Sequence, residues 1–177
     1  MIGQEDAAGA LASVERTRRR AGELRGYAHG GDIVLAWGLV WLVCNLATQF
    51  APLWGHQTWP FGVTAAVIFS MIRGRASGKG DWRVFATTCT ALGLLALVSL
   101  VTEVKGSDEA NVLISLFVAA AYVAAGIWSG ARYAWAGLAI AAFASAGWFV
   151  DREHLNLWLG LGGGGAFILT GLWMRRA

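Results

Sequence analysis

The amino-acid sequence predicts an all-α membrane protein with six transmembrane helices in three antiparallel hairpins. Hydrophobic residues make up 56% of the 177 residues and charged residues only 14%, whereas soluble domains are about a quarter charged. The charges also cluster, because they fall in the first 32 residues and in short segments between long apolar runs. An α-helix needs about 20 apolar residues to cross the hydrocarbon core of a bilayer, so each run is a candidate span.

The six apolar runs occupy residues 33–53, 58–72, 84–104, 110–128, 131–150 and 155–174. The second run is the shortest, and Arg73 and Arg75 at its end are expected to extend toward the membrane surface. The connections between the runs are short, so consecutive helices should be antiparallel neighbours. We therefore divide the chain into a segment 1–32 that precedes the bundle and a six-helix transmembrane domain 33–177.

Lysine and arginine are distributed unequally between the two sides of this bundle, and cytoplasmic segments carry the excess. Twelve of the 14 lie in the N-terminal segment, the second and fourth connections and the C-terminal tail: Arg16, Arg18, Arg19, Arg20, Arg25, Arg73, Arg75, Lys79, Arg83, Arg132, Arg175 and Arg176. The other connections hold only Lys105 and Arg152. Both termini are therefore predicted to be cytoplasmic. The composition is similar to that of small Ala/Gly/Trp-rich proteins in the inner membrane of high-GC bacteria, which is the expected location.

Residues 1–32 are predicted to form an amphipathic, basic helix. Small and apolar residues recur at heptad-like spacing, and Arg16, Arg18, Arg19 and Arg20 cluster on the other face. Such a helix can lie on the inner leaflet, where each basic residue near anionic lipid contributes about 1 kcal/mol. It can also pair with a cytoplasmic protein, or serve only as a cap that sets the topology. The pattern is not that of a cleaved signal peptide.

The most polar stripe within any span lies on the first helix. Its members follow one another at i, i+4 spacing, which places them on one side of a helix: Trp37, Trp41, Asn45 and Gln49. One interpretation is the lining of a small cavity or groove. The other is a set of interhelical hydrogen bonds, which are common in membrane bundles.

The later helices carry small residues at the spacing that lets two backbones approach closely. Gly126 and Gly130 form one G-x-x-x-G motif, and Gly160 and Gly164 form another. Such motifs predict close helix packing in lipid, where burial supplies no driving force between helices. The glycine run 162–165 lacks the Lys-Ser/Thr ending of a phosphate-binding loop, so packing or a local helix distortion is expected there.

Cofactor and catalytic chemistry receive little support from the sequence. His56 and His154 lie at the outer ends of spans near acidic residues, but they lack the fixed spacing of a metal site. Bound haem needs histidines within helices, and ion-coupled transport usually uses an ionisable residue inside a span. The spans hold no histidine, and none carries a charged residue near its middle. We therefore expect no cofactor, no metal and no enzymatic activity.

The expected function is that of a small membrane protein acting through protein or lipid contacts, as a regulatory, sensory or accessory subunit. Its partners would be the lipid bilayer, a second copy or another membrane protein, and not nucleic acid. The alternative is a passive channel or transporter for a small neutral or apolar solute, with the stripe from Trp37 to Gln49 lining its path. A cavity along the stripe would favour transport, and an exposed small-residue face would favour contact.

Overall fold

The computed structural model describes residues 4–76, 82–104 and 106–176. This described part of the chain is 92% helical and contains no strand, which confirms the all-α prediction. In chain order the elements are α1 (Gln4–Phe50), η1 (Gly55–Gln57), α2 (Thr58–Ala76), α3 (Trp82–Val101), α4 (Ser107–Ser129), α5 (Ala131–Val150), η2 (Arg152–His154), α6 (Leu155–Leu157), η3 (Trp158–Gly164) and α7 (Gly165–Arg175).

Within the described residues, four stretches of helix are long and apolar enough to cross a membrane: Gly30–Phe50, Ser107–Ser129, Ala131–Val150 and Arg152–Arg175. They indicate a membrane protein. α2 and α3 cover the second and third predicted runs but are not among the four. The apolar part of α2 ends at Arg73. In α3 the described apolar stretch, Cys89–Val101, is shorter than the four candidate spans.

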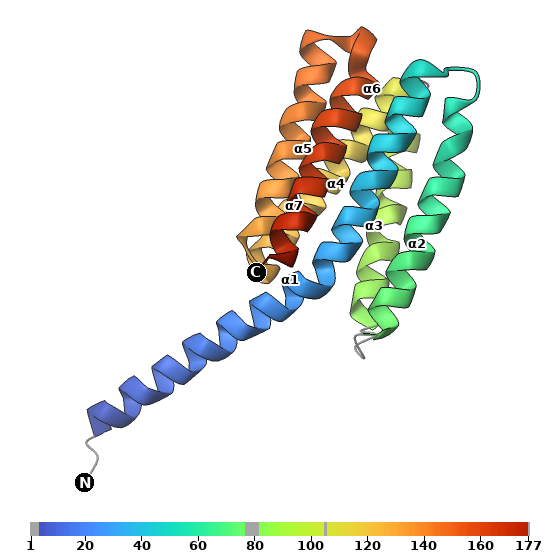
Figure 1. The fold of residues 1–177 in the computed structure, drawn as a ribbon. Helices are drawn as coiled ribbons and strands as arrows, with labels where there is room; N and C mark the ends of the chain where they lie inside the picture. The colour runs from blue at the N-terminus through green and yellow to red at the C-terminus, as the bar shows by residue number, and fades with distance from the viewer. Residues whose placement is uncertain (1–3, 77–81, 105, 177) are drawn as a thin grey trace.

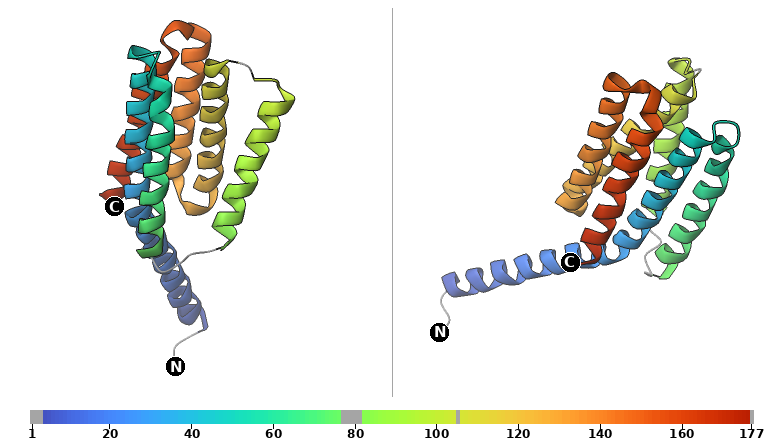
Figure 2. Two further views of the ribbon diagram at one scale, coloured as in Figure 1. Left: turned by 90° about the vertical axis from the view of Figure 1, so that its right-hand side faces the viewer. Right: turned by 45° about the horizontal axis from the view of Figure 1, so that its top comes forward.

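The helices pack side by side around α1 and α5 (Figures 1 and 2). α1 lies against α2 on one side and against η3 and α7 on the other, while α5 packs on α4, η3 and α7. α3 is peripheral, and its main neighbour is α4. The end of the bundle that carries η1 and η2 is called the η end, and the opposite end, where α5 begins and α7 finishes, is called the basic end.

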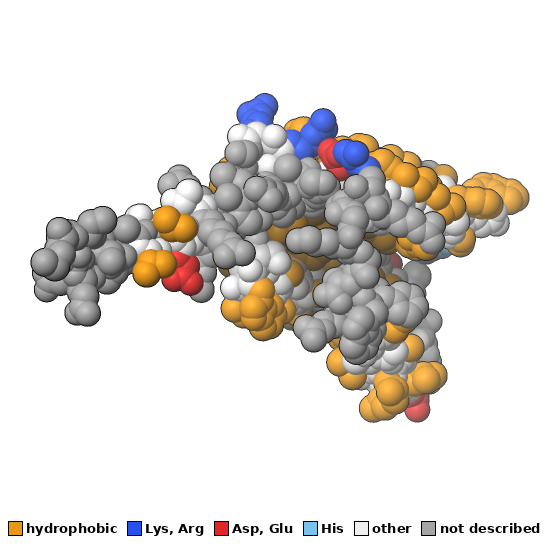
Figure 3. All heavy atoms as spheres, turned by 90° about the horizontal axis from the view of Figure 1, so that it is seen from below, with side chains coloured by type: hydrophobic (Ala, Val, Ile, Leu, Met, Phe, Trp, Pro, Cys, Tyr) orange, Lys and Arg blue, Asp and Glu red, His pale blue; other side chains and the backbone are white. Residues whose placement is uncertain are grey.

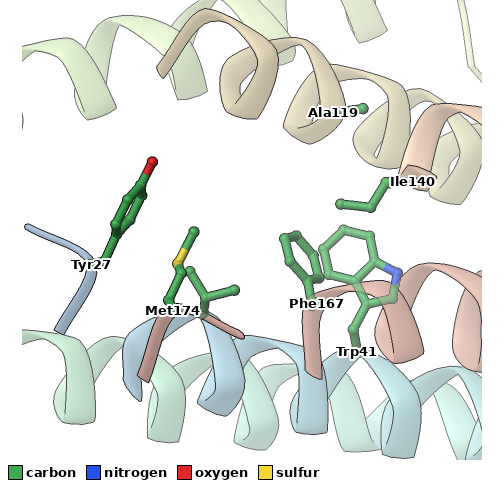
Figure 4. Close-up of a cluster of buried hydrophobic side chains, with 7 residues drawn as sticks. Tyr27, Trp41, Ala119, Ile140, Phe167 and Met174 are labelled. Atoms are coloured by element: carbon green, nitrogen blue, oxygen red, sulfur yellow. The ribbon is translucent and has the colours of Figure 1, made fainter. Parts of the chain in front are cut away.

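The core is aromatic at its centre. Trp41 from α1 packs edge-on against Phe167 from α7, with ring centroids 5.8 Å apart. Phe167 in turn contacts Tyr122 of α4, with centroids 4.9 Å apart. Figure 4 shows Trp41 and Phe167 beside Ile140 and Ala119, with Met174 and Tyr27 further toward the basic end. Trp41, Phe167 and Ile140 are all buried.

Glycines allow the closest helix contacts. A Cβ built on Gly164 would lie 2.8 Å from the backbone N of Leu42, and one built on Gly126 would lie 2.5 Å from the Cβ of Ala134. Gly160 lies against Asn45, where a Cβ would be 3.1 Å from the Asn45 Cβ. These motif glycines therefore face neighbouring helices inside the bundle.

Gly130 has a different role from the other motif glycines. It joins α4 to α5 with φ of 113°, a conformation that side-chain-bearing residues rarely adopt. A Cβ at this position would also collide with the hydroxyl of Tyr27. The conformation and the space both require glycine at this turn.

The last membrane helix is interrupted by η3, which is π-helical over Trp158–Gly164. π-Helical turns are rare and mark places where a helix is locally distorted. η3 contains Gly160, Gly162, Gly163 and Gly164, and it packs on α1 and α5. The glycine run is therefore a helix distortion at a packing contact, one of the two outcomes expected for it.

α1 is one continuous helix of 47 residues, so it passes the proposed domain boundary at residue 32 without interruption. Its first half leaves the bundle at the basic end and projects away from it (Figures 1 and 2). We call residues 4–26 of α1 the arm. The pair Gly30 and Gly31 lies where the helix leaves the bundle, and paired small residues are a common place for a helix to bend.

Candidate functional site

Three asparagine side chains form a hydrogen-bonded chain at the η end, which we call the amide chain. Asn45, which is fully buried, donates from Nδ2 to the backbone carbonyl of Trp41 at 2.8 Å. Its Oδ1 accepts from Nδ2 of Asn111 at 2.9 Å. Asn111 Nδ2 also donates to Oδ1 of Asn156 at 2.9 Å. The amide chain thus joins α1, α4 and the start of α6.

The helix ends bring these residues to one level. Asn45 lies about one turn before the end of α1, Asn111 lies one turn into α4, and Asn156 is the second residue of α6. Because α1 runs toward the η end while α4 and α6 start there, the three positions meet. Ser115 Oγ donates to the backbone carbonyl of Asn111 at 2.7 Å, so this carbonyl already accepts a side-chain hydrogen bond.

A pocket of about 410 Å³ opens beside the amide chain. Asn111 and Asn156 line it together with Thr48 of α1 and Trp59 of α2. The Trp59 indole Nε1 donates to the Thr48 hydroxyl at 3.3 Å, so that wall is fixed by its own hydrogen bond. His56 and Asp108 also belong to the lining. We call this cavity the end pocket.

Two ion pairs form near the η end among the described residues. Arg152 forms an ion pair with Glu109, and its guanidinium lies 3.9 Å from the ring centroid of Trp148. His154 Nδ1 lies 3.0 Å from Asp151 Oδ1. The hydrogen bond with His154 lowers the pKa of the Asp151 carboxyl, so this acid stays ionised.

The four residues of the predicted polar stripe have separate surroundings. Trp37 Nε1 donates to Ser70 Oγ of α2 at 3.2 Å, and Trp41 packs in the core, 5.8 Å from the Trp59 ring. Asn45 belongs to the amide chain, and Gln49 Nε2 donates to the Glu153 carbonyl at 3.3 Å. Each residue therefore ties α1 to a neighbouring element, and Asn45 reaches the end pocket through Asn111. A cavity along the whole stripe stays a prediction.

Two buried polar atoms in the stripe are unpaired. Among the described residues, Trp41 Nε1 and Gln49 Oε1 have no hydrogen-bond partner. A buried group without a partner costs about 1–3 kcal/mol. The stripe is therefore not optimised for bundle stability alone.

The basic end holds a second polar cluster, centred on Asp32 of α1. Asp32 forms ion pairs with Arg73 of α2 and with Arg175 of α7, the latter at 3.2 Å. Its side chain is only 15% exposed. These pairs connect three helices at the point where α1 leaves the bundle.

The root of the arm is also held by aromatic contacts. Tyr27 is buried and its ring centroid lies 6.0 Å from that of Tyr133. Arg132 places its guanidinium 4.7 Å from the ring centroids of both Tyr27 and Trp173, and donates to the Trp173 carbonyl at 2.9 Å. The arm therefore leaves the bundle from a fixed point.

Other predicted sites are placed as follows. The side chains of Arg16, Arg18, Arg19 and Arg20 lie outside the described residues, although their backbone belongs to α1. His56 lines the end pocket and His154 pairs with Asp151. Within the described part of the chain, no cluster of three or more His, Cys, Asp or Glu side chains could hold a metal ion.

Sequence reasoning missed Asn111, Asn156 and Asp32. The sequence did contain a signal for the two asparagines. Each is the second residue of an apolar run, at the end of the predicted bundle toward which the second half of the first run, with Asn45, extends. Comparison with models of protein families, with curated proteins and with solved structures finds no match. The function is therefore argued from the geometry alone.

Proposed function

We propose that this chain is a small, non-enzymatic inner-membrane protein of six spanning helices that acts as a regulatory, sensory or accessory subunit, and that its arm is the contact surface. The observation that carries the proposal is the anchored root of the arm. Tyr27 and Asp32 are held on the bundle while the arm projects beyond it (Figure 1). The arm's contact partner is the inner leaflet of the membrane.

The case for six spans rests on exposed apolar side chains on α2 and α3. Phe61, Ile68 and Ile72 on α2 are all more than half exposed, as are Leu97 and Leu100 on α3. Large apolar patches of this kind are unusual on a surface that faces water. At about 1.5 Å per residue, the 19 residues of α2 and the 20 of α3 reach about 30 Å, the thickness of the hydrocarbon core.

The orientation is supported by the charges at the basic end. Arg73, Arg132, Arg175 and Arg176 lie at this end, whereas Arg152 lies at the η end. Viewed from the basic end, described Arg side chains gather along one edge, with an acidic side chain between them (Figure 3). Cytoplasmic segments carry the excess of Lys and Arg, so the basic end is assigned to the cytoplasm.

A membrane contact for the arm follows from the physics of isolated helices. Helices without tertiary packing are marginal in water even at favourable composition, and the arm projects away from the bundle (Figure 2). Its Leu11 and Val14 are 70% and 63% exposed. An anionic surface at the basic end would cover these side chains and attract the arginines of the arm, each contributing about 1 kcal/mol.

The test places an environment-sensitive fluorophore on Val14→Cys in full-length protein whose Cys44 and Cys89 are replaced by alanine. In nanodiscs that contain phosphatidylglycerol, the label should report an apolar environment, and in phosphatidylcholine discs it should report water. Salt should reverse the effect, because exposed charge interactions are screened beyond about 10 Å at 0.1 M. Replacing Arg16, Arg18, Arg19 and Arg20 by glutamine should abolish the apolar signal in phosphatidylglycerol discs, whereas Arg152→Gln at the η end should leave that signal unchanged. A label that reports water in both lipids contradicts the proposal.

The transport alternative has less support. Trp41, one turn before Asn45, packs against Trp59 and Phe167, so a solute that reached the amide chain would next meet a packed aromatic core. Liposome flux measurements test this point. Solute flux through the unaltered protein that disappears in an Asn45→Leu, Gln49→Leu double variant would establish transport in place of the contact function.

A further inference from the structure

The amide chain leaves hydrogen-bonding groups free at the end pocket. Asn111 uses both Nδ2 hydrogens, one for Asn45 and one for Asn156. Among the described residues its Oδ1 has no hydrogen-bond partner, and neither has Nδ2 of Asn156. Asn111 and Asn156 both line the pocket. The lining of the end pocket therefore includes two linked amide side chains that keep one acceptor and one donor group free.

The orientation of these groups is fixed from inside the bundle. The Trp41 carbonyl can only accept, so Asn45 must turn its Nδ2 toward that carbonyl and its Oδ1 toward Asn111. Asn111 must then present Nδ2, and Asn156 must receive it on Oδ1. The free atoms at the pocket follow from this sequence of donors and acceptors. The site is preorganised, which lowers the cost of binding.

We propose that the end pocket binds a small neutral molecule that carries a carboxamide or urea group on an apolar body. Such a group presents a carbonyl and an N–H side by side, which complements the free Asn156 Nδ2 and the free Asn111 Oδ1. The side chains of Trp59, Pro60 and Ile114 supply apolar walls. A volume of about 410 Å³ lies in the range of small-molecule sites, about 300–1,000 Å³.

The charge of the pocket excludes an acid of the same shape. Among the described residues that line the pocket, Asp108 is the acidic one and none is Lys or Arg. A carboxylate ligand would meet Asp108 and would also place its second oxygen against Asn111 Oδ1, where two acceptors repel. Neutral amides are therefore favoured over carboxylic acids. This site lies at the opposite end of the molecule from the arm, and its test is independent of the arm's contact with lipid.

The experiment measures binding of three probes to the full-length protein in detergent by ligand-observed NMR with titration. Benzamide carries the proposed group, benzoate has the same shape with a charge, and toluene has the apolar body alone. Benzamide should bind saturably, and benzoate and toluene should each bind at least about tenfold more weakly, the equivalent of one well-made hydrogen bond. A short-chain ceramide, added as a fourth probe, tests whether the amide comes from a lipid. If the ceramide binds and benzamide does not, the proposal of a small water-borne ligand is overturned.

Two substitutions test the assignment of atoms. Asn156→Asp keeps the oxygen that accepts from Asn111 but replaces the free donor with a second acceptor, so benzamide affinity should fall about tenfold. Gln57→Glu is the matched control, because it adds the same charge at the η end on an exposed residue outside the pocket lining, and it should leave benzamide affinity unchanged. Asp108→Asn in the pocket lining should reduce the ratio of benzamide affinity to benzoate affinity.

The proposal fails if benzamide binds no more tightly than toluene, or if folded Asn156→Asp protein binds benzamide like the unaltered protein. If Asn156→Asp does not fold, Asp108→Asn decides. Asp108 lies in the first turn of α4 and outside the amide chain. If the ratio of benzamide affinity to benzoate affinity in that variant equals the ratio in the unaltered protein, the proposal is overturned.

Discussion

Replacing Gly164 by alanine tests a close contact between η3 and the backbone of α1. A Cβ at this position would lie 2.8 Å from Leu42 N, 3.0 Å from Leu42 Cα and 3.1 Å from the carbonyl oxygen of Gly38. All three atoms belong to the backbone of α1, whereas ordinary van der Waals contact begins near 3.4 Å. α1 and η3 must therefore separate by several tenths of an ångström, and overpacking of this kind costs about 1–3 kcal/mol.

Gly165→Ala is the matched control, because a Cβ at Gly165 meets nothing within 4 Å. Both substitutions gain the same helix propensity, up to about 1 kcal/mol, so the difference between them isolates the packing cost. We expect Gly164→Ala to be less stable than Gly165→Ala by about 1–3 kcal/mol. Unfolding in mixed micelles with increasing SDS, followed by helical circular dichroism, measures both. Equal stability of the two variants would refute the close contact between η3 and α1.

Three further predictions concern topology and polar contacts. In a background without cysteine, Ser107→Cys at the η end should react with an impermeant thiol reagent in intact cells and Ser129→Cys at the basic end should not; the reverse pattern would invert the orientation. Asn45→Leu should cost only about 1 kcal/mol in the SDS unfolding assay, because hydrogen bonds in membrane bundles average about 0.6 kcal/mol each; a loss several times larger would make the amide chain essential to the fold. Asp32→Asn should lower the free energy of unfolding by about 1 kcal/mol at low salt, because the arginines paired with Asp32 are about half exposed. High salt should remove this difference in stability. A loss of stability that does not depend on salt would contradict an electrostatic origin.

The helical regions were predictable because each depends on local composition. An apolar run of about 20 residues is a property of the chain itself, and all six predicted runs lie largely within helices. The number of membrane spans depends on more than hydrophobicity. α2 ends in a basic turn and lies beside α1, so its burial in lipid depends on packing against a longer neighbour.

The site was only partly predictable, because its members come from three helices. Asn45 drew notice through the i, i+4 stripe, which is a pattern within one helix. Its partners Asn111 and Asn156 are single polar residues in separate runs. Their meeting depends on how α4 and α6 are rotated about their axes, and one sequence contains no signal for that rotation. Asp32 was missed because the sequence analysis assigned it to the segment 1–32 before the bundle, whereas it is held against Arg73 and Arg175.

The π-helical segment η3 sets the angular phase between the two halves of the last membrane helix. A π turn closes one residue later than an α turn, so α7 is rotated about its axis relative to an unbroken α-helix that continues from α6. This offset allows Asn156 to face Asn111 while Phe167 faces Trp41. Removing one residue from η3 would turn one half of the helix against the other, and either the amide chain or the aromatic core would lose its partner.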